Sequence, residues 1–560
     1  MIIKNSGGFM KRIVSLVLAI LAVLFLYGCD SSGEKDAEKE KVMDISGKYV
    51  LNEELNEAII DDFGTVTDTV DGNARVFYQI FVGSFSDSDG DGIGDLRGII
   101  NRFDYLNDGD DNSGLSLGVE GIWLTPIFES PSYHKYDVSN YYEIDSDFGN
   151  MDDLKDLIKI CHERNVKIIL DLPINHTSIS NLWYTRFLNA HKEDNIDSEY
   201  YDYYVYSDRS EPGRTFAQIY SGSDEYYECN FSRDMPELNF DNEAVKKEVV
   251  DISRFYLDMG VDGFRFDAAK YIFLSNEGKN AQFWSWYMDE LRSIKNDIYT
   301  VAEVWDSDSI TYPYFASTNC FNFSMSQFSG RIAQTAKAGN VNVFTAYVDK
   351  YLDDIEKRNP DAMMISFISN HDMDRAAGYL TYPSGQAKVA ANLSILLPGS
   401  SFVYYGEEIG MKGSRGSENT DANRRLAMLW GDDDTVSNPV GANYAVEQSN
   451  GTVASHKPDG NSLYNHYKKL IAIRKANPEI SYGEYTPFNI ADSKLGGFIS
   501  TYEGSTVAVL HNTSLSAVEI DISTITDVEF KVISAYVGVG AAKLEGTTLT
   551  IDGQTSVVLK

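Results

Sequence analysis

Short apolar runs that alternate with helical stretches constrain the fold of this chain more than any other feature. Eight such runs begin at Arg75, Val119, Val166, Val261, Ile298, Cys320, Met363 and Ser401. In the intervening segment from Asn150 to Asn165, four apolar residues recur on one helical face. Alternation of strands and helices favours a parallel sheet. Eight units between residues 75 and 475 predict an α/β fold with a closed (β/α)8 TIM barrel, because an open sheet would be expected to carry a glycine-rich nucleotide turn that this sequence lacks.

Two further domains are expected beside the barrel. The connection after the third strand, about residues 176–240, is rich in Tyr, Asp and Ser and is far longer than an ordinary strand-to-helix loop. We interpret it as a small inserted domain. After residue 480 the pattern changes to alternating strands with turn residues, which predicts a C-terminal antiparallel β-sandwich domain over residues 480–560.

Residues 1–29 resemble a bacterial lipoprotein signal peptide. A basic pair precedes an apolar run from Ile13 to Tyr27, which is too short for a comfortable membrane span, and a small residue precedes Cys29. We expect acylation of Cys29 and lipid anchoring of the protein to the membrane, at the extracellular face of the bacterial cell envelope. The alternative, an uncleaved anchor, would also tether the chain outside the cell. Residues 30–74 are interpreted as a polar linker.

Charge and cysteine usage exclude some classes of partner and site. The 84 acidic and 48 basic residues give a net charge of -36, which repels phosphate backbones, so nucleic acid is not expected as a partner. Beyond Cys29 the sequence has three widely spaced cysteines and no CxxC pair, so we expect no disulfide framework.

The stretch DSDGDGIGD after the first predicted strand has the spacing of a calcium-binding loop. Its candidate ligands are the carboxylates of Asp87, Asp89, Asp91 and Asp95 and the main chain of Ile93. However, a glycine stands where an EF-hand has a bidentate glutamate. Taken alone, the stretch is compatible with a calcium-sensor half-site, a solvated acidic turn or a structural ion loop.

Three carboxylates fall where a barrel places its chemistry. Asp267, Glu303 and Asp372 each follow an apolar run, and barrel active sites lie at the C-terminal ends of the strands. A single acid at a strand end is more often a helix cap or a turn former. Three acids on separate strands, each beside another polar group, favour a functional site.

Four motifs make the chain similar to a known family. DLPINH (171–176), GFRFDAAKY (263–271), AEVW (302–305) and FISNHD (367–372) occur in the order, and on the predicted strands, of the α-amylase family, glycoside hydrolase family 13. MPELNF (235–240) resembles a further motif near the end of that family's inserted domain. The similarity covers about residues 75–560. Together with the N-terminal signal, it suggests an extracellular α-amylase of lipoprotein type.

The resemblance implies a role for nine residues. Asp267 would be the nucleophile, Glu303 the general acid and base, and Asp372 the carboxylate that binds the hydroxyls of the reacting sugar. Substrate contacts are implied for Tyr136, His176, Arg265, Lys270, His371 and Arg425. Without the motifs, the two histidines would be interpreted as buried structural residues. Arg265 would keep Asp267 ionised, and crowding by the other two acids would keep Glu303 protonated, as retaining hydrolysis requires.

The substrate is less constrained than the chemistry. AAKY is close to the AAKH of true α-amylases, and Tyr133 stands where exo-acting relatives often carry an aspartate. We therefore expect an open cleft and internal cleavage of α-1,4-glucosidic bonds in starch, glycogen or maltooligosaccharides. The alternatives are neopullulanase- or cyclomaltodextrinase-like activity, and α-glucosidase activity of the oligo-1,6-glucosidase kind. A non-catalytic glucan-binding lipoprotein is less favoured because all three acids are present.

The resemblance also bears on the acidic loop. Several members of the family carry a calcium loop of matching spacing directly after the first barrel strand. The four carboxylates would repel one another without a cation, so we expect a structural Ca²⁺ that holds this loop at the rim of the active-site face. Many amylases hold calcium between barrel and inserted domain, which would place a second ion at Asn175.

Overall fold

The computed structural model describes residues 72–560 apart from 210, 383 and 417–419. The predicted signal peptide, Cys29 and nearly all of the predicted linker lie outside the described residues. Within the described part of the chain, no helix has the length and apolar character needed to cross a membrane. Cys161, Cys229 and Cys320 are buried and free.

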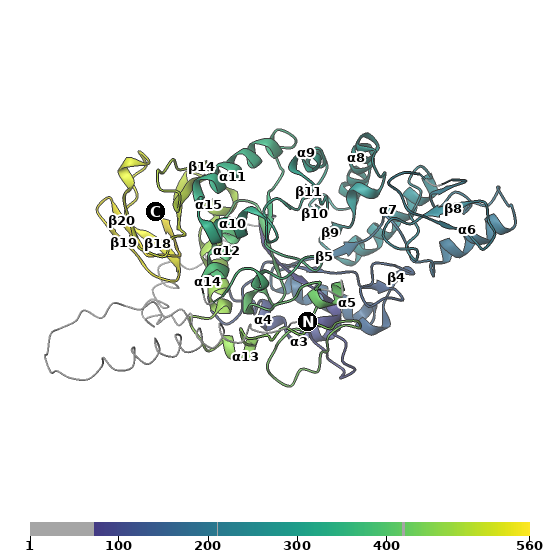
Figure 1. Cartoon of the computed structure of the whole chain (residues 1–560), viewed down its shortest axis with the longest axis horizontal. Helices are drawn as coiled ribbons and strands as arrows, with labels where there is room; N and C mark the ends of the chain where they lie inside the picture. Colours follow the sequence, from purple (N-terminus) through teal and green to yellow (C-terminus); the bar gives the residue numbers. More distant parts are fainter. Residues whose placement is uncertain (1–71, 210, 383, 417–419) are drawn as a thin grey trace, which may run out of the picture. The chain divides into compact units, whose positions relative to one another are not determined.

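Eight parallel strands form the central sheet, as the sequence predicts (Figure 1). They are β1 (Val76–Ile80), β2 (Gly121–Leu124), β5 (Lys167–Leu172), β9 (Gly263–Phe266), β10 (Tyr299–Ala302), β11 (Asn319–Cys320), β12 (Ile365–Phe367) and β13 (Ser400–Tyr404). Their spatial order is β11-β10-β9-β5-β2-β1-β13-β12. A parallel bridge between Phe321 and Ile365, with a 3.0 Å hydrogen bond from Asn322 N to Ile365 O, joins the two outer strands. The (β/α)8 barrel is therefore confirmed.

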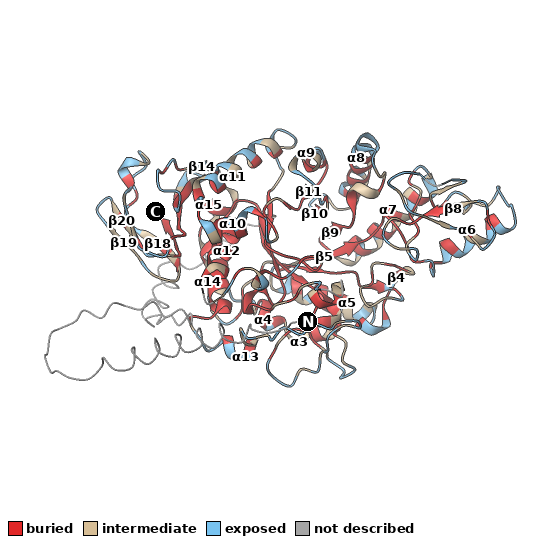
Figure 2. Cartoon of the chain, in the orientation of Figure 1, coloured by how far each residue is buried: buried red, intermediate tan, exposed pale blue. Residues whose placement is uncertain are grey.

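Helices surround the barrel and turn their buried sides toward it (Figure 2). The longer ones are α3 (Leu96–Asn101), α5 (Met151–Glu163), α7 (Glu243–Met259), α8 (Glu277–Ile294), α10 (Arg331–Ala338), α11 (Val341–Glu356), α12 (Gln386–Ile395) and α14 (Leu463–Ala476). The shorter ones are α4 (Phe103–Leu106), α9 (Asp308–Thr311), α13 (Val453–His456) and α15 (Pro478–Tyr482). Asn150 caps α5 by accepting hydrogen bonds from two main-chain N–H groups of its first turn.

Aromatic side chains fill the inside of the barrel. Phe77 of β1 and Phe402 of β13 stack with ring centroids 4.8 Å apart. Gly121 makes room for this packing, because a Cβ at that position would lie 2.4 Å from the Phe77 ring. Trp123 belongs to the same cluster and also contacts Arg265, whose guanidinium carbon lies 5.2 Å from the centre of the indole ring. The cluster thus supports the residues at the C-terminal ends of the strands.

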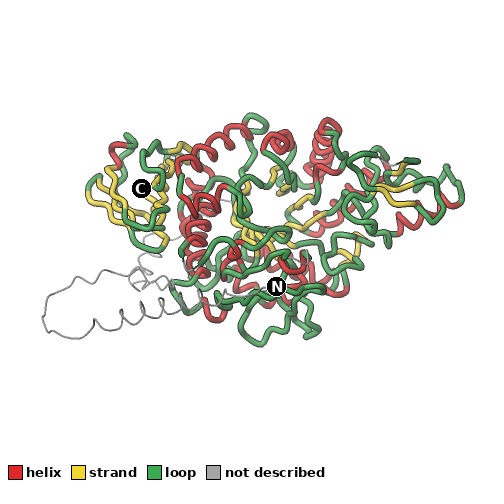
Figure 3. Tube along the Cα trace, viewed as in Figure 1, coloured by secondary structure: helices red, strands yellow, loops and turns green. Residues whose placement is uncertain are grey.

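Two elements are inserted into the barrel frame (Figure 3). The hairpin β3 (Phe128–Glu129) and β4 (Asn140–Ile144) follows β2. Between β5 and α7 lie α6 (Leu182–Lys192) and a three-stranded sheet of β6 (Tyr206–Ser207), β8 (Tyr226–Glu228) and β7 (Phe216–Gln218). A bridge from His176 to Glu237 connects the two ends of this long insertion, and a bridge from Tyr204 to Leu238 joins its middle to its second end.

The C-terminal domain is antiparallel, as predicted. One sheet has the order β14-β15-β16-β21-β18 and the other β17-β20-β19. The strands are β14 (Glu484–Pro487), β15 (Leu495–Tyr502), β16 (Ser505–Asn512), β17 (Val518–Asp521), β18 (Ile533–Gly538), β19 (Ala542–Glu545), β20 (Thr548–Ile551) and β21 (Thr555–Leu559). Both sheets contribute to one apolar core, which includes Leu510, Leu549 and Val557.

Candidate active site

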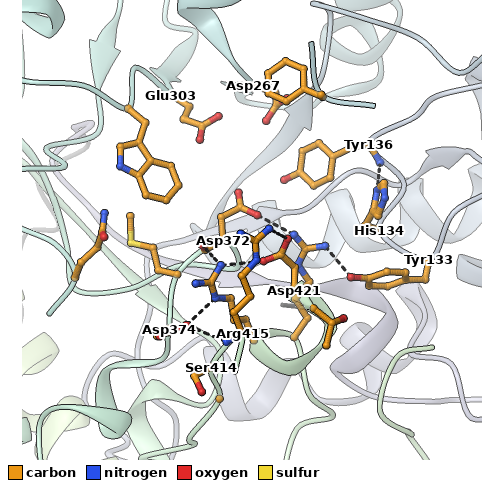
Figure 4. A pocket seen from close by; sticks show the side chains of 18 of the residues that line it. Tyr133, His134, Tyr136, Asp267, Glu303, Asp372, Asp374, Ser414, Arg415 and Asp421 are labelled. Carbon is orange, nitrogen blue, oxygen red and sulfur yellow. Dashed lines mark hydrogen bonds and ion pairs between the residues drawn. The ribbon is translucent and has the colours of Figure 1, made fainter. Parts of the chain in front are cut away.

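A pocket of about 1090 Å³ opens at the C-terminal ends of the barrel strands, and all three predicted acids line it (Figure 4). Asp267 directly follows β9 and Glu303 directly follows β10. Asp372 lies in the loop after β12. The barrel therefore brings together three carboxylates that are far apart in the sequence.

Arg265 lies behind two of these acids and joins them. Its Nη1 is 2.5 Å from Asp267 Oδ1 and 2.8 Å from Asp171 Oδ1, and its Nη2 is 2.9 Å from Glu303 Oε2. The arginine is 1% exposed and does not line the pocket. The structure thus places Arg265 as a positioning residue for the carboxylates, in contrast to the substrate contact implied by the resemblance.

The pKa of Glu303 is raised to about 7, chiefly because its carboxyl is buried. Arg265 opposes this rise, and the charges of Asp267 and Asp372 add to it. Glu303 therefore holds its proton more strongly than an ordinary glutamate, as expected, but burial rather than crowding by the other acids is the largest cause of its raised pKa. Burial also raises the pKa of Asp267, and the charge of Arg265 opposes that rise.

The turn after Asp267 fixes the orientation of Glu303. Ala268 adopts the left-handed backbone conformation, with φ of 48° and ψ of 39°, which is uncommon for a residue with a Cβ. In this conformation its N–H donates a 3.0 Å hydrogen bond to Glu303 Oε2, and the Ala269 N–H donates to the main-chain oxygen of Glu303. The ends of β9 and β10 are thereby tied together at the two acids.

Asp372 has cationic and polar partners of its own. Arg425 Nη2 lies 2.8 Å from its Oδ1, and His371 Nε2 lies 3.1 Å from its Oδ2. Burial alone would raise the pKa of Asp372, but these two partners hold it well below its usual range. Arg425 lines the pocket and also donates to the Tyr133 hydroxyl at 3.1 Å. Asp372 is therefore ionised at neutral pH.

His371 is fully buried and does not line the pocket, although the resemblance implies a direct sugar contact. Gln79 donates to its Nδ1 at 2.7 Å, which leaves the ring proton on Nε2, next to the Tyr136 hydroxyl at 2.6 Å. Tyr136 in turn donates to Asp171 Oδ2 at 2.8 Å. His371 thus acts through Tyr136 and Asp372. The sequence analysis assigned no role to Gln79 or Asp171.

Tyr136 and His176 line the pocket, as expected of substrate-binding residues. Burial lowers the pKa of His176 to about 4, so its imidazole is neutral. Within the described part of the chain, its Nε2 is buried and has no hydrogen-bond partner. A sugar hydroxyl would satisfy this atom.

Lys270 lies outside the pocket lining. Its Nζ donates to the main-chain oxygen of Trp305 at 2.9 Å and forms an ion pair with Asp306 at 3.0 Å.

Trp305 itself lines the pocket, is 39% exposed and stacks on Phe323 with ring centroids 5.0 Å apart. Phe231 of the inserted segment also lines the pocket and is 46% exposed. The sequence analysis missed both aromatic residues, although Trp305 stands two positions after Glu303.

A network of charged side chains lines another part of the pocket (Figure 4). Arg424 contacts Asp374 at 2.9 Å and Asp421 at 2.8 Å, and Arg415 contacts Asp421 at 2.8 Å. Asp374 lies after β12, and the other three lie after β13, where Asp421 and Arg424 begin and end a short 3-10 helix. No sequence pattern singled them out, because charged residues in connecting segments are common.

The acidic loop brings together three of its predicted ligands. Asp87, Asp89 and Asp95 each have one carboxylate oxygen within 4.8 Å of those of the other two. Carboxylate oxygens are the donors that Ca²⁺ prefers. Asp91 is outside this group, and its Oδ1 accepts from the Ile93 N–H at 2.7 Å. The donor set fits a calcium ion, with three carboxylates in place of the predicted four.

Asn175 has a different partner from the expected ion. Its side-chain amide donates to the carboxyl of Glu237, and its main-chain oxygen accepts from the Leu238 N–H at 2.9 Å. Burial raises the pKa of Glu237 to about 8, so this carboxyl is largely neutral. Around Asn175, the described residues provide no cluster of three acidic groups suited to a metal.

Comparison with known proteins agrees with this geometry. Residues 79–483 match the family model described as alpha amylase, catalytic domain. The chain is 34% identical over 490 residues to alpha-amylase 3 of Dictyoglomus thermophilum, covering 87% of this chain and 93% of that one. It is 32% identical over 355 residues to a 4-alpha-glucanotransferase of Thermotoga maritima, covering 61% and 74%.

A solved structure is similar over most of the chain. Eubacterium rectale Amy13B superimposes with a TM-score of 0.81 at 34% identity, covering 88% of this chain and 96% of that one. With the barrel, the pocket and its three acids, these matches lead to one conclusion. The chain belongs to the α-amylase family, glycoside hydrolase family 13.

Proposed function

We propose that this enzyme hydrolyses internal α-1,4-glucosidic bonds of starch, glycogen or maltooligosaccharides with retention at the anomeric carbon. The observation that carries the proposal is the pair Asp267 and Glu303, joined by Arg265 within one pocket. Arg265 forms an ion pair with each carboxyl group, and the pKa of Glu303 is raised to about 7, so Glu303 can hold a proton near neutral pH. Two such carboxyl groups are what glycoside hydrolysis requires.

The proposed reaction has two steps. In the first, Glu303 gives its proton to the glycosidic oxygen while Asp267 attacks the anomeric carbon, so that a glycosyl-enzyme ester forms and the leaving sugar departs. In the second, Glu303 takes a proton from water, and the hydroxide oxygen displaces Asp267 from the same carbon. Asp372 stays ionised throughout and accepts hydrogen bonds from the hydroxyls of the reacting ring.

The pocket supports internal cleavage. Trp305, next to the acid Glu303, and Phe231 provide exposed aromatic surface for sugars on the leaving side. Tyr133, held by Arg425, replaces the aspartate of exo-acting relatives.

Product analysis tests the proposal. Soluble starch, maltotriose, pullulan and isomaltose are incubated with the enzyme and with Glu303→Gln. We expect the iodine staining of starch to fall rapidly, because internal cleavage shortens the chains. The products should be mixed maltooligosaccharides. Release of glucose alone from chain ends would contradict internal cleavage, and a preference for pullulan or isomaltose would favour one of the alternative activities.

Sugar transfer is a second candidate activity. A relative that matches 61% of this chain is named a 4-alpha-glucanotransferase, and the exposed Trp305 ring beside Glu303 could hold an acceptor sugar in place of water. Transfer would give products longer than the substrate. Their formation from maltotriose at high concentration is therefore the test.

We further propose a structural calcium ion and an extracellular, lipid-anchored location. Asp87, Asp89 and Asp95 would hold the ion, which would neutralise their mutual repulsion. The neighbouring loop supports the same segment, because Thr435 donates to Asp87 at 2.7 Å and Ser437 N–H donates to Gly92 O at 2.8 Å. Mass spectrometry of the mature N-terminus would test acylation of Cys29.

A further inference from the structure

A second hollow lies outside the catalytic pocket, between the β3–β4 hairpin and the first turn of α6. Its volume is about 460 Å³. Tyr142 of β4 and Trp183 of α6 line it with aromatic surface, and Glu129, Asn140 and Thr185 line it with polar groups. We propose that this hollow is a second binding site for an α-glucan chain. The proposal rests on the proposed function, because it takes the ligand to be the enzyme's own substrate class.

The aromatic residues are placed as fixed platforms. Trp183 stacks on Tyr141 at 5.9 Å between ring centroids and packs edge-on against Tyr203 at 5.8 Å. Tyr142 packs edge-on against Phe255 at 5.3 Å and is still 37% exposed. A sugar ring has an apolar face that packs on such a surface, and aromatic rings held by their neighbours lose little conformational entropy on binding.

The polar groups select a neutral ligand. Glu129 is exposed, and within the described part of the chain no ion pair or hydrogen bond engages its carboxylate. The other lining residues carry hydroxyl, amide or apolar side chains, with no basic residue among them. A phosphate or another anion would therefore meet a negative charge without a cationic partner. A polyhydroxylated sugar can instead donate to the carboxylate while its apolar face covers the rings.

Two adjacent chain segments, 136–142 and 176–183, run from the catalytic pocket to the hollow. The Ser178 N–H donates to Val138 O at 2.9 Å, so the two segments run together. The first residue of each segment lines the catalytic pocket and the last lines the hollow. Six residues span at most roughly 20 Å, so one long glucan chain could reach both sites. Binding at two sites raises the effective concentration of a polymer at the cleft without affecting short substrates in the same way.

Binding is measured in the full chain with Glu303→Gln, which prevents turnover. Calorimetric titration with maltohexaose should show two sites, and adding Tyr142→Ala should weaken one of them at least fivefold. Tyr142→Phe keeps the ring and should retain both sites. Val528→Ala removes an apolar side chain of similar exposure, 39%, from the C-terminal domain and serves as the matched control. In the active enzyme, Tyr142→Ala should raise the ratio of KM for starch to KM for maltotriose at least threefold.

Several outcomes would overturn the proposal. One is a single maltohexaose site in the Glu303→Gln protein, and another is two unchanged sites after Tyr142→Ala. If Tyr142→Ala lowers the melting temperature, Glu129→Ala is tested instead, because the side chain of Glu129 is exposed and supports no packing. If the affinity of the weaker maltohexaose site is the same with and without Glu129→Ala, the proposal is overturned. An enzyme that fails to cleave any α-glucan, yet loses one maltohexaose site with Tyr142→Ala, would refute the proposed function and leave the second site standing.

Discussion

Replacing Glu303 by glutamine should separate its chemical role from its structural one. Glu303 Oε2 accepts from the Ala268 N–H at 3.0 Å and from Arg265 at 2.9 Å. A glutamine can direct its carbonyl oxygen toward both donors and its amide NH2 toward the pocket. We therefore expect the variant to fold and to bind substrate like the wild type, with a melting temperature within about 2 °C, because no buried donor is left unsatisfied.

The loss of activity should be large, because the amide cannot donate a proton to the glycosidic oxygen. General acid catalysis contributes about 100- to 10,000-fold, or about 3–5 kcal/mol of barrier, so kcat/KM for maltohexaose should fall by that factor. With 4-nitrophenyl α-maltoside the leaving group needs little protonation. The first step should then survive, and a burst of nitrophenol close to one equivalent should precede a slow phase, because Glu303 is also the base of the second step.

The pH profile provides an independent check. The pKa of Glu303 is raised to about 7, and the reactive form is protonated, so wild-type kcat/KM should fall as the pH rises above about 7. In Glu303→Gln this alkaline limb should be absent. Glu484→Gln, an exposed change in the C-terminal domain, is the matched control. A variant with more than half of the wild-type activity, or with the alkaline limb intact, would refute the assignment of Glu303 as the general acid.

Three further predictions concern the acidic loop, the leaving side and the buried acids. Chelation, or Asp89→Asn, should lower the melting temperature before it changes the product pattern; no thermal shift with chelator would indicate an acidic turn without an ion. Trp305→Ala should lower kcat/KM for maltohexaose about 3- to 10-fold, or about 0.6–1.4 kcal/mol, while Trp305→Phe retains most of it; equal loss with nitrophenyl maltoside would contradict a leaving-side contact. Glu407 is buried and its pKa is raised to about 7, so its stabilising contribution, at most about 4 kcal/mol, is complete below about pH 4.3 and is lost as the pH rises through about 7. Urea unfolding at pH 5 and pH 8 should therefore show a smaller pH dependence for Glu407→Gln, and an unchanged difference would contradict this.

The barrel could be predicted because its signal is local. The barrel strands lie in short apolar runs, and several helices carry their own cap and apolar face, as in α5 with Asn150. The pocket acids could be predicted for the same reason, since a parallel barrel collects the residues that follow its strands. Asp267, Glu303 and Asp372 needed no contact information to be placed on the same side of the fold.

The residues behind the pocket wall depend on contacts that one sequence does not show. Gln79 reaches His371 across 292 positions of the chain, and Tyr136 reaches Asp171 across 35. Gln79 and Asp171 are both polar residues within apolar strands. This position in the sequence indicates that they are buried, but it does not show which residues they contact. The resemblance implied a direct sugar contact for Arg265 and His371. Only the packing shows that both lie behind the pocket surface and act through other residues.

The proton needed for catalysis follows from burial together with the number of carboxylates that share one cation. Arg265 contacts Asp171, Asp267 and Glu303, and ionising all three would leave two negative charges uncompensated in a buried site. The set therefore retains protons near neutral pH, as the raised pKa values of Asp171, about 8, and Glu303, about 7, indicate. Asp171 is fully buried, whereas Glu303 lines the pocket, so the proton that a substrate can reach lies on Glu303. Asp372, which has a cation of its own, stays ionised beside it.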